Sequence, residues 1–360
     1  MTYSNSDHHI LVAPLNWGLG HATRCIPIIH ALEESGFTPI LASDGVALAM
    51  LRKEFPHLQV LELPSYEIEY AKNGANFKWK MLANIPKMAE AILAEKKIVK
   101  KWVKEYELIG IISDNRLGVF SKKVPSVFMT HQLNVLTGNT TWISSKMHQF
   151  IIRKYTECWV PDFAGKPNLT GKLGHLKTPD EKIRYIGPLS RFRTIDMPKK
   201  FDLMVILSGP EPQRGMLESQ LREDLQQFDG KIIFISGKVE ARQKKEQIGD
   251  LTFYNFMTTD QLEIAFNESE KVLCRSGYTT IMDLAKLGKK AFFIPTPGQY
   301  EQEYLAKKLK RDGFVPYVKQ EDFQLENLLE IDIFKGLPKM DSNIHWKQLF
   351  GIFEKDAVAK

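Results

Sequence analysis

The sequence predicts an α/β protein built from two domains of the same plan, each with a mainly parallel sheet covered by helices. Three observations support this prediction. Short apolar runs alternate with amphipathic helical segments along the chain, a pattern typical of parallel sheets with right-handed crossovers. The pattern pauses at residues 186–200, a polar, proline-containing stretch, and then starts again. A length of 360 residues also suits two domains better than one.

The first half contains six apolar runs that are short enough to be buried strands. They lie at residues 9–14, 38–43, 58–64, 108–114, 124–130 and 158–163. Amphipathic segments at residues 22–36 and 45–55 follow the first two runs and predict helices, the first of which ends at Gly36. The first half therefore predicts a sheet whose strands are joined by helices.

The second half repeats this order. Its apolar runs lie at residues 201–209, 231–237, 251–256, 271–277 and 290–296. Helical patterns follow several of them, and residues 342–355 predict a last amphipathic helix. We place the domains at residues 1–190 and 191–340, with a C-terminal helical segment at residues 341–360.

Composition excludes several classes of protein. Hydrophobic residues make up 43% of the chain, and the three cysteines have neither disulfide nor metal-site spacing. The chain has neither a signal-peptide pattern nor an apolar run of the roughly 20 residues that a spanning helix needs. We expect a cytoplasmic protein. The net charge of +6 suits phosphate-bearing ligands or anionic lipid. Because the sequence has no nucleic-acid-binding motif, we expect no nucleic-acid partner.

The most informative stretch is 272–309, which predicts a βαβα unit. Arg275, Ser276 and Gly277 open its first helix, where free backbone N–H groups and the helix dipole attract an anion. Asp283, one to two turns along, is a candidate acceptor for ribose hydroxyls. Gln302 and Glu303 open the next helix and are candidates for sugar binding. The alternative is an ordinary βαβα unit without a ligand.

These residues resemble the nucleotide-sugar half of GT-B glycosyltransferases, and most closely glycosyltransferase family 28. That family has an Arg-(Ala/Ser)-Gly turn, then an acidic residue for ribose, then a proline-containing loop and a polar pair for the donor sugar. The resemblance implies a GT-B fold, with two Rossmann-like domains facing across a cleft. It further implies that residues 1–190 bind the acceptor, that residues 191–340 bind the nucleotide-sugar, and that residues 341–360 pack back on the first domain.

The family also has an N-terminal glycine-rich loop that ends in Gly-His, matched here by Gly18, Gly20 and His21. In the family the loop faces the acceptor and the histidine is a candidate base, a role that suits the ordinary pKa of imidazole. The alternative is a histidine that merely caps a helix. Asp114, which ends the run at 108–114, is a candidate partner for His21.

Further candidates follow other strands. Ser208, Gly209 and Arg214 match the family's second phosphate loop, against the alternative of a structural turn. Phe256 is a candidate platform for uracil, although a phenylalanine there is more often part of the core. His131 and Asn134 resemble the family's His-Glu-Gln-Asn stretch, which ends in a glycine matched by Gly138. We expect acceptor contacts there, although His131 is as readily a structural histidine.

The resemblance implies an inverting transfer of a hexosyl or N-acetylhexosaminyl group from a UDP-sugar to an acceptor hydroxyl, without a metal or other cofactor. We expect a cell-envelope lipid or glycan as acceptor. Residues 72–104 predict a pair of helices. They are rich in lysine and include Trp79 and Met81. They are either a solvated helical face over a core stripe or a contact with anionic lipid at the inner face of the plasma membrane. A UDP-sugar 2-epimerase and a non-catalytic nucleotide-sugar-binding subunit remain open alternatives.

Overall fold

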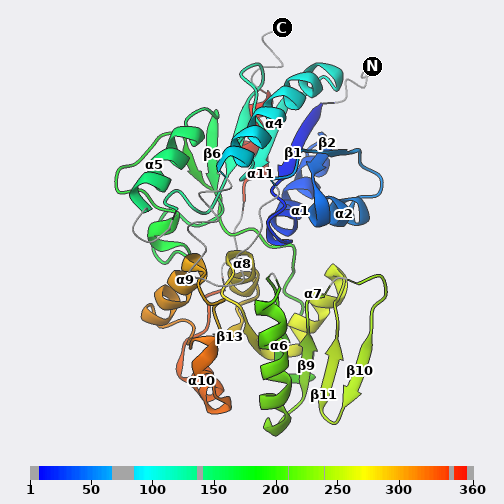
Figure 1. The fold of residues 1–360 in the computed structure, drawn as a ribbon, viewed down its shortest axis with the longest axis vertical. Coiled ribbons are helices and arrows are strands. Elements are labelled where there is room, and N and C mark those ends of the chain that lie inside the picture. Colours follow the sequence, from blue (N-terminus) through cyan, green and yellow to red (C-terminus); the bar gives the residue numbers. More distant parts are fainter. Residues whose placement is uncertain are drawn as a thin grey trace. The chain divides into compact units, whose positions relative to one another are not determined.

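The computed structural model describes residues 8–66, 85–135, 141–209, 211–238, 240–339 and 344–354. It divides the chain into two compact units (Figure 1). Unit 1 comprises Met1–Leu189 and Asn343–Lys360, and unit 2 comprises Ser190–Ser342. Trp79, Met81 and Gly138 lie outside the described residues.

Unit 1 contains a seven-stranded parallel sheet in the order β3-β2-β1-β4-β5-β6-β7. Its strands are β1 (His9–Pro14), β2 (Thr38–Ser43), β3 (Val60–Glu62), β4 (Gly110–Asp114), β5 (Ser126–Met129), β6 (Glu157–Val160) and β7 (Ile183–Tyr185). Its helices are α1 (Gly20–Glu34), α2 (Gly45–Glu54), α4 (Ile85–Glu105), α5 (Thr141–Ile152) and α11 (Trp346–Glu354). The strand order reverses between β1 and β4, so their carboxyl ends form the switch point at which doubly wound sheets bind ligands.

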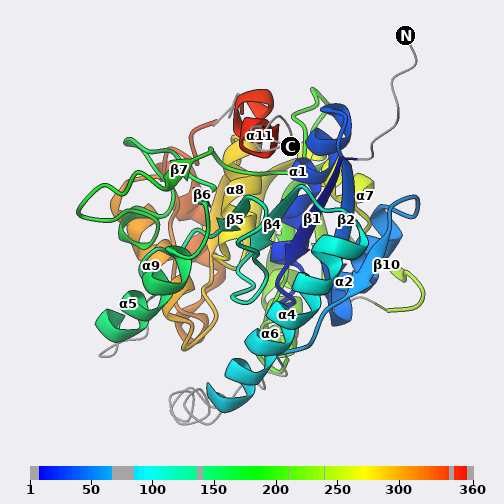
Figure 2. The same cartoon turned by 90° about the horizontal axis from the view of Figure 1, so that it is seen from above.

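Helices cover both faces of this sheet because successive strand residues point to opposite sides. Leu11 and Ile111 pack with Val99 and Trp102 of α4 on one face. On the other face, the Phe353 ring of α11 lies so close to Gly110 that a Cβ there would stand 2.3 Å from the ring. Figure 2 shows α4 on one side of these strands and α11 on the other.

Helix α4 has a stripe of buried residues on one side and lysines on the other. Its buried residues recur at helical spacing: Ala91, Glu95, Val99, Trp102 and Val103. Its lysines lie largely on the exposed side. For residues 85–105 the structure therefore has the core stripe and the solvated face; lipid contact stays a prediction. None of the described helices has both the length and the apolar character needed to cross a membrane.

Unit 2 contains a six-stranded sheet in the order β10-β11-β9-β8-β12-β13. Its strands are β8 (Phe201–Ile206), β9 (Ile232–Ile235), β10 (Lys245–Ile248), β11 (Leu251–Tyr254), β12 (Ser269–Cys274) and β13 (Lys290–Phe293). Its helices are α6 (Gln213–Asp224), α7 (Thr259–Glu268), α8 (Tyr278–Leu287), α9 (Tyr300–Arg311) and α10 (Glu330–Ile333). All pairings are parallel except that of β10 with β11, an antiparallel edge ribbon that the apolar pattern did not predict.

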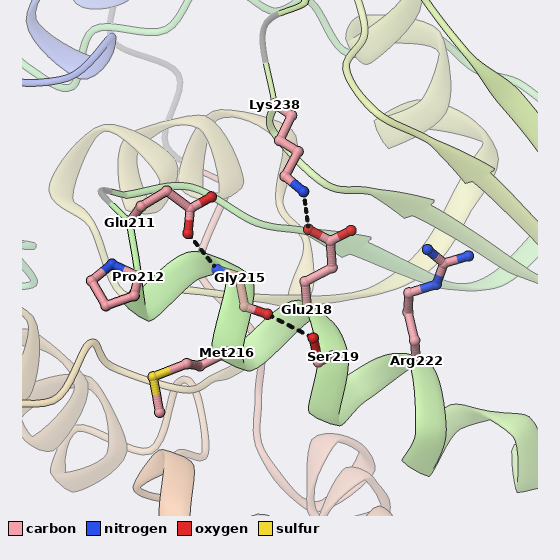
Figure 3. Close-up of a pocket in the computed structure, with 8 residues that line it drawn as sticks. All are labelled: Glu211, Pro212, Gly215, Met216, Glu218, Ser219, Arg222 and Lys238. Atoms are coloured by element: carbon pink, nitrogen blue, oxygen red, sulfur yellow. Dashed lines mark hydrogen bonds and ion pairs between the residues drawn. The ribbon is translucent and has the colours of Figure 1, made fainter.

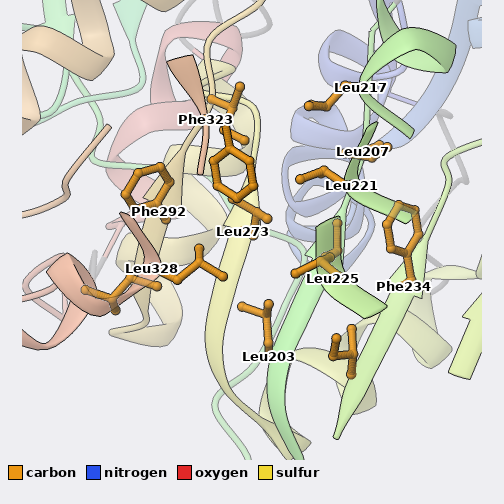
Figure 4. Packing of buried hydrophobic residues seen from close by; sticks show 14 of the residues in the cluster. Leu203, Leu207, Leu217, Leu221, Leu225, Phe234, Leu273, Phe292, Phe323 and Leu328 are labelled. Carbon is orange, nitrogen blue, oxygen red and sulfur yellow. The ribbon is translucent and has the colours of Figure 1, made fainter. Parts of the chain in front are cut away.

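One hydrophobic cluster joins the sheet of unit 2 to its helices (Figure 4). Leu203 of β8 and Leu273 of β12 pack with leucines of α6 on one side and with Phe292 and Phe323 on the other. All these side chains are nearly inaccessible to solvent. The cluster fixes the carboxyl ends of β8 and β12, from which the loops discussed below emerge.

We predict that Phe353→Ala lowers the free energy of unfolding of unit 1 by about 3–5 kcal/mol, because it leaves a cavity beside Gly110 in a fully buried site. Phe150→Ala in α5 is the matched control, since that ring is 62% exposed. Urea unfolding measures both. Equal losses for the two variants would contradict the packing of α11 described above.

Candidate functional site

The turn after β1 is held in a fixed shape. Gly18 has a φ of 73°, a left-handed conformation that favours glycine, and Gly20 is the first residue of α1. The Nδ2 atom of Asn16 donates to Asp44 Oδ2 at 3.1 Å, and the backbone N–H of Ala47 donates to Asn16 Oδ1 at 3.2 Å. Asn16 thus ties the turn to the start of α2.

Asp114 and His21 come together at the switch point of unit 1. Pro14 pairs with Asp114 in the register of β1 and β4, so the carboxylate lies beside the turn that leads into α1. His21 Nδ1 lies 3.1 Å from Asp114 Oδ1. The side chain of His21 is 13% exposed and that of Asp114 is fully buried. The structure therefore brings together the two residues that the sequence named as a base and its partner.

Arg24, one turn along α1, compensates the buried carboxylate. Its Nε donates to Asp114 Oδ2 at 2.7 Å, and its Nη2 also donates to Asp114 Oδ1. Nη2 lies 2.9 Å from His21 Nδ1, and Nη1 lies 2.9 Å from His131 Nδ1. One buried guanidinium thus contacts Asp114 and both histidines.

This cluster shifts the ionisation of its members. Burial alone would raise the pKa of Asp114, but Arg24 and His21 outweigh it and hold that pKa well below its ordinary value. Burial lowers the pKa of His21; Asp114 opposes this effect and Arg24 adds to it. At neutral pH the site therefore holds a carboxylate, a guanidinium and a neutral imidazole at position 21.

Sequence reasoning missed Arg24, although a signal was present. Gly-His-x-x-Arg places Arg24 three residues after His21, and residues at this spacing share one face of a helix. Asn134, by contrast, was named for acceptor binding. Its Nδ2 donates to the backbone oxygens of Lys172 and His175, and its Oδ1 accepts from Gln149 Nε2. Asn134 is thus part of the local framework, and its acceptor contact stays a prediction.

In unit 2, α8 begins where the sequence placed an anion site. Gly277 is its N-cap in extended conformation and provides no side chain to cap the first turn. The Ser276 hydroxyl donates to the backbone oxygen of Gln302 at 2.9 Å. The start of α8 is thereby tied to the start of α9.

Arg275 has a framework contact for each terminal nitrogen. Its Nη1 donates to the backbone oxygens of Ile294 and Pro295, and its Nη2 to the backbone oxygen of Gln213 and to Gln320 Oε1. Burial lowers its pKa to about 10. A contact of Arg275 with the bound anion stays a prediction.

The loop between β13 and α9 is closed by the polar pair named above. Gln302 Oε1 accepts from the backbone N–H of Thr296 at 2.9 Å, and Glu303 Oε1 accepts from that of Gly298 at 3.0 Å. Beside this loop two buried atoms have no hydrogen-bond partner: Thr296 Oγ1 and Arg275 Nε. Unsatisfied buried polar atoms are uncommon in folded proteins, and a bound water, ion or ligand can supply the missing partner. Thr296 was not predicted from the sequence.

Asp283 is nearly buried on α8. Its Oδ1 accepts from Ser190 Oγ at 2.6 Å. Burial raises its pKa to about 6, although Arg191 and Ser190 act in the opposite direction. Asp283 is therefore a carboxyl group that ionises close to neutrality, beside the candidate anion site.

The remaining candidates lie near α6 and α7. Ser208 and Gly209 follow β8 and are exposed. Arg214 is buried, where Nη1 donates to Glu218 Oε2 at 2.8 Å and Nη2 to Glu211. Two carboxylates therefore already neutralise Arg214, whose predicted phosphate contact remains untested. Phe256 is half-buried just before α7.

An open cavity of about 480 Å³ lies along α6 (Figure 3). It is lined by Glu211, Pro212, Gly215, Met216, Glu218, Ser219, Arg222 and Lys238, none of which the sequence analysis placed in the site. Glu211 pairs with Arg214, and Glu218 with Arg214 and Lys238. The acidic groups of this cavity therefore already have cationic partners within unit 2.

Comparison with known proteins supports one family. Residues 213–344 match the glycosyltransferase family 28 C-terminal domain. The chain is 25% identical to the UDP-N-acetylglucosamine–N-acetylmuramyl-(pentapeptide) pyrophosphoryl-undecaprenol N-acetylglucosamine transferase of Haemophilus ducreyi. This alignment spans 252 residues and covers 67% of each chain. The protein of the same name from Glaesserella parasuis is 22% identical over 322 residues, or 86% of this chain and 85% of that one.

Solved structures give the fold. MurG of Acinetobacter baumannii matches with a TM-score of 0.59 and 13% identity, covering 97% of this chain and 99% of that one. The calicheamicin glycosyltransferase CalG4 matches with a TM-score of 0.63 and 10% identity, covering 98% and 95%. These matches confirm the predicted α/β class and GT-B fold.

We predict that the free energy of unfolding of the Asp283→Asn variant increases relative to that of wild type as the pH rises. Because the folded-state pKa of about 6 lies above the ordinary 3.8, the folded protein retains a proton that the unfolded chain has lost. The contribution of Asp283 to stability is therefore present below pH 4 and lost as pH rises through 6. Between pH 4 and 8 the difference in free energy of unfolding should change by about 3 kcal/mol in favour of the variant.

Urea unfolding of both proteins at several pH values measures this difference. Asp250→Asn, at an exposed position in the same unit, is the control. A pH-independent difference between Asp283→Asn and wild type would show that Asp283 ionises with an ordinary pKa.

Proposed function

Since this chain is a MurG-like glycosyltransferase with a family 28 C-terminal domain and uses a UDP-sugar donor, we propose that His21 is the base of the transfer and that Asp114 is its partner. The observation that carries the proposal is the contact of 3.1 Å between His21 Nδ1 and Asp114 Oδ1 at the switch point of the first sheet. A carboxylate that accepts a hydrogen bond from the Nδ1–H group of an imidazole leaves the lone pair on Nε2, where a base needs it.

The reaction that we propose is a direct displacement with inversion. His21 Nε2 takes the proton of the acceptor hydroxyl, and the acceptor oxygen bonds to the anomeric carbon of the sugar. The bond from that carbon to the UDP oxygen breaks, so the products are the glycoside, UDP and protonated His21. Asp114 stabilises the imidazolium during this step because its charge lies 3.1 Å away.

We assign the donor to unit 2. The start of α8, whose N-cap residue is Gly277, suits the diphosphate, and the helix dipole there stabilises its growing negative charge as UDP departs. Asp283 is proposed for the ribose hydroxyls, and the loop closed by Gln302 and Glu303 for the sugar. The unpartnered Thr296 Oγ1 and Arg275 Nε support a ligand at this edge of the sheet.

For the acceptor we propose a lipid-linked glycan of the cell envelope. The relatives named above are transferases to a pyrophosphoryl-undecaprenol acceptor, and their names give N-acetylglucosamine as the transferred group. We further propose that the enzyme works in the cytoplasm and contacts anionic lipid through residues 72–104. The exposed lysines of α4 support this contact. A UDP-sugar 2-epimerase and a non-catalytic subunit are not favoured by the transferase relatives.

We predict that His21→Ala lowers kcat by about 10²–10⁴-fold and leaves UDP binding unchanged, because general base catalysis typically contributes that much. His30→Ala is the matched control, since His30 lies on the same helix with its side chain 56% exposed. Release of UDP in the presence of acceptor measures turnover, and calorimetry measures binding. Unchanged turnover in His21→Ala would remove His21 from the base role, and conversion of the donor sugar without acceptor would favour the epimerase.

We predict that dialysis against EDTA changes the transfer rate by less than about twofold, because the helix start is proposed to stabilise the leaving diphosphate. The same assay after addition of Mg²⁺ is the comparison. A rate that disappears with EDTA and returns with Mg²⁺ would contradict this part of the proposal.

A further inference from the structure

The turn between β1 and α1 carries a large aromatic side chain close to the candidate base. Trp17 is 41% exposed, and it stands four residues before His21. Asn16 holds the turn in place through its contacts with Asp44 and with the backbone of Ala47. A turn that is already ordered loses little conformational entropy when a ligand binds against its side chains.

A second side chain at this edge of the sheet is Asn115, which directly follows Asp114. Its φ of 58° lies in the left-handed region, which side chains other than that of glycine rarely adopt. Asn115 is half-buried, and among the described residues its side-chain amide has no hydrogen-bond partner. An amide both donates and accepts hydrogen bonds, so Asn115 is able to bind a hydroxyl group.

Backbone pairing brings these residues to one place. The N–H of Leu15 donates to the backbone oxygen of Asp114 at 2.9 Å. Trp17 follows Leu15 by two residues, and Asn115 follows Asp114 by one. His21 Nδ1 lies 3.1 Å from the Asp114 carboxylate. An indole, an amide and an imidazole therefore all lie at the carboxyl ends of β1 and β4.

This set of groups suits a sugar ring. A pyranose has an apolar face of C–H groups, which packs against an aromatic ring, and hydroxyl groups at its rim, which need polar partners. Small-molecule sites typically combine aromatic contacts with a few well-placed polar groups in this way. Residues 15–20 carry no charged side chain, so the turn suits a neutral ring.

We propose that Trp17 and Asn115 form a subsite of unit 1 for the acceptor sugar. Trp17 packs against the ring whose hydroxyl gives its proton to His21, and Asn115 binds another hydroxyl of the same ring. The role in transfer rests on the proposed function, which it deepens by naming a neutral sugar as the group held at the base. Binding of a sugar to the subsite requires no transfer, so the two claims are tested separately.

Binding is measured by saturation-transfer NMR on the full-length protein with UDP and with the methyl glycosides of glucose, galactose and N-acetylglucosamine. We expect transfer to the ring C–H protons of at least one glycoside. Its binding should be about tenfold weaker in Trp17→Ala and within about threefold of wild type in Trp17→Phe, which keeps an aromatic face.

Val46→Ala is the matched control, since Val46 is 58% exposed at the start of the neighbouring helix α2. It should bind the glycoside as wild type does. Equal binding by wild type and Trp17→Ala would overturn the proposal, and so would the absence of binding by every glycoside to wild type.

Asn115→Gly separates the amide from the backbone conformation, because glycine adopts a φ of 58° without strain. Glu107→Gly is its control, since Glu107 is exposed before β4 with a φ of 48°. We expect about fivefold weaker glycoside binding in Asn115→Gly and no change in Glu107→Gly. Unchanged binding in Asn115→Gly would show that the asparagine serves only the turn, and would remove it from the subsite.

Transfer is then measured with UDP-N-acetylglucosamine and the glycoside that binds best. Trp17→Ala should raise the KM for the glycoside about tenfold and leave kcat and the KM for the UDP-sugar within about twofold, because Trp17 holds the acceptor and takes no part in proton transfer. A decrease in kcat alone would contradict this role. Sugar binding that depends on Trp17, without transfer by the wild-type protein, would keep the subsite and reject the proposed function.

Discussion

The structure of unit 1 depends on one buried charge. Asp114 ends a central strand and is fully buried, and an uncompensated carboxylate there would be strongly destabilising. Arg24 compensates it with two hydrogen bonds from the first turns of α1, and His21 occupies a remaining acceptor position. The need to neutralise Asp114 therefore fixes how α1 begins, and with it the position of His21. Structure and proposed chemistry share the same atoms, so changes at this cluster should affect both.

A second buried network keeps the neighbouring turn in place. Arg116 Nε donates to Glu95 Oε1 and its Nη1 to Asp44 Oδ1, each at 2.7 Å, and Asp44 also holds Asn16. This chain of contacts connects α4 to the turn before His21. In unit 2 the polar contacts of Arg275 and Gln302 similarly shape the loops at the carboxyl ends of β12 and β13. In both units, charged and amide groups near the candidate site mainly fix loops, and few are left to contact a ligand.

Much of the fold could be predicted because buried parallel strands leave continuous apolar runs. The runs at residues 9–14 and 38–43 coincide with β1 and β2, and every other run that we interpreted as a strand overlaps one. Strand β10 could not be predicted in this way, since all four of its residues are exposed and it pairs only at a sheet edge. For the site, we selected His21, Asp114 and His131 because they lie at or after the ends of predicted strands. In the structure Arg24 contacts all three. Arg24 and Glu95 were missed because a charged residue in an amphipathic helix normally indicates a solvated face, and both are buried here.

Nucleotide binding is the sharpest test of a UDP-sugar donor site on unit 2. Calorimetry with UDP, ADP, GDP, CDP and TDP should show one site that selects UDP. Asp283→Ala should weaken UDP binding about tenfold, as expected for loss of one hydrogen bond to a charged group. Asp332→Ala should leave it unchanged, since the side chain of Asp332 is 57% exposed and pairs with lysines. Absence of binding by every nucleotide, or equal affinity for all of them, would show that unit 2 has no UDP-sugar site.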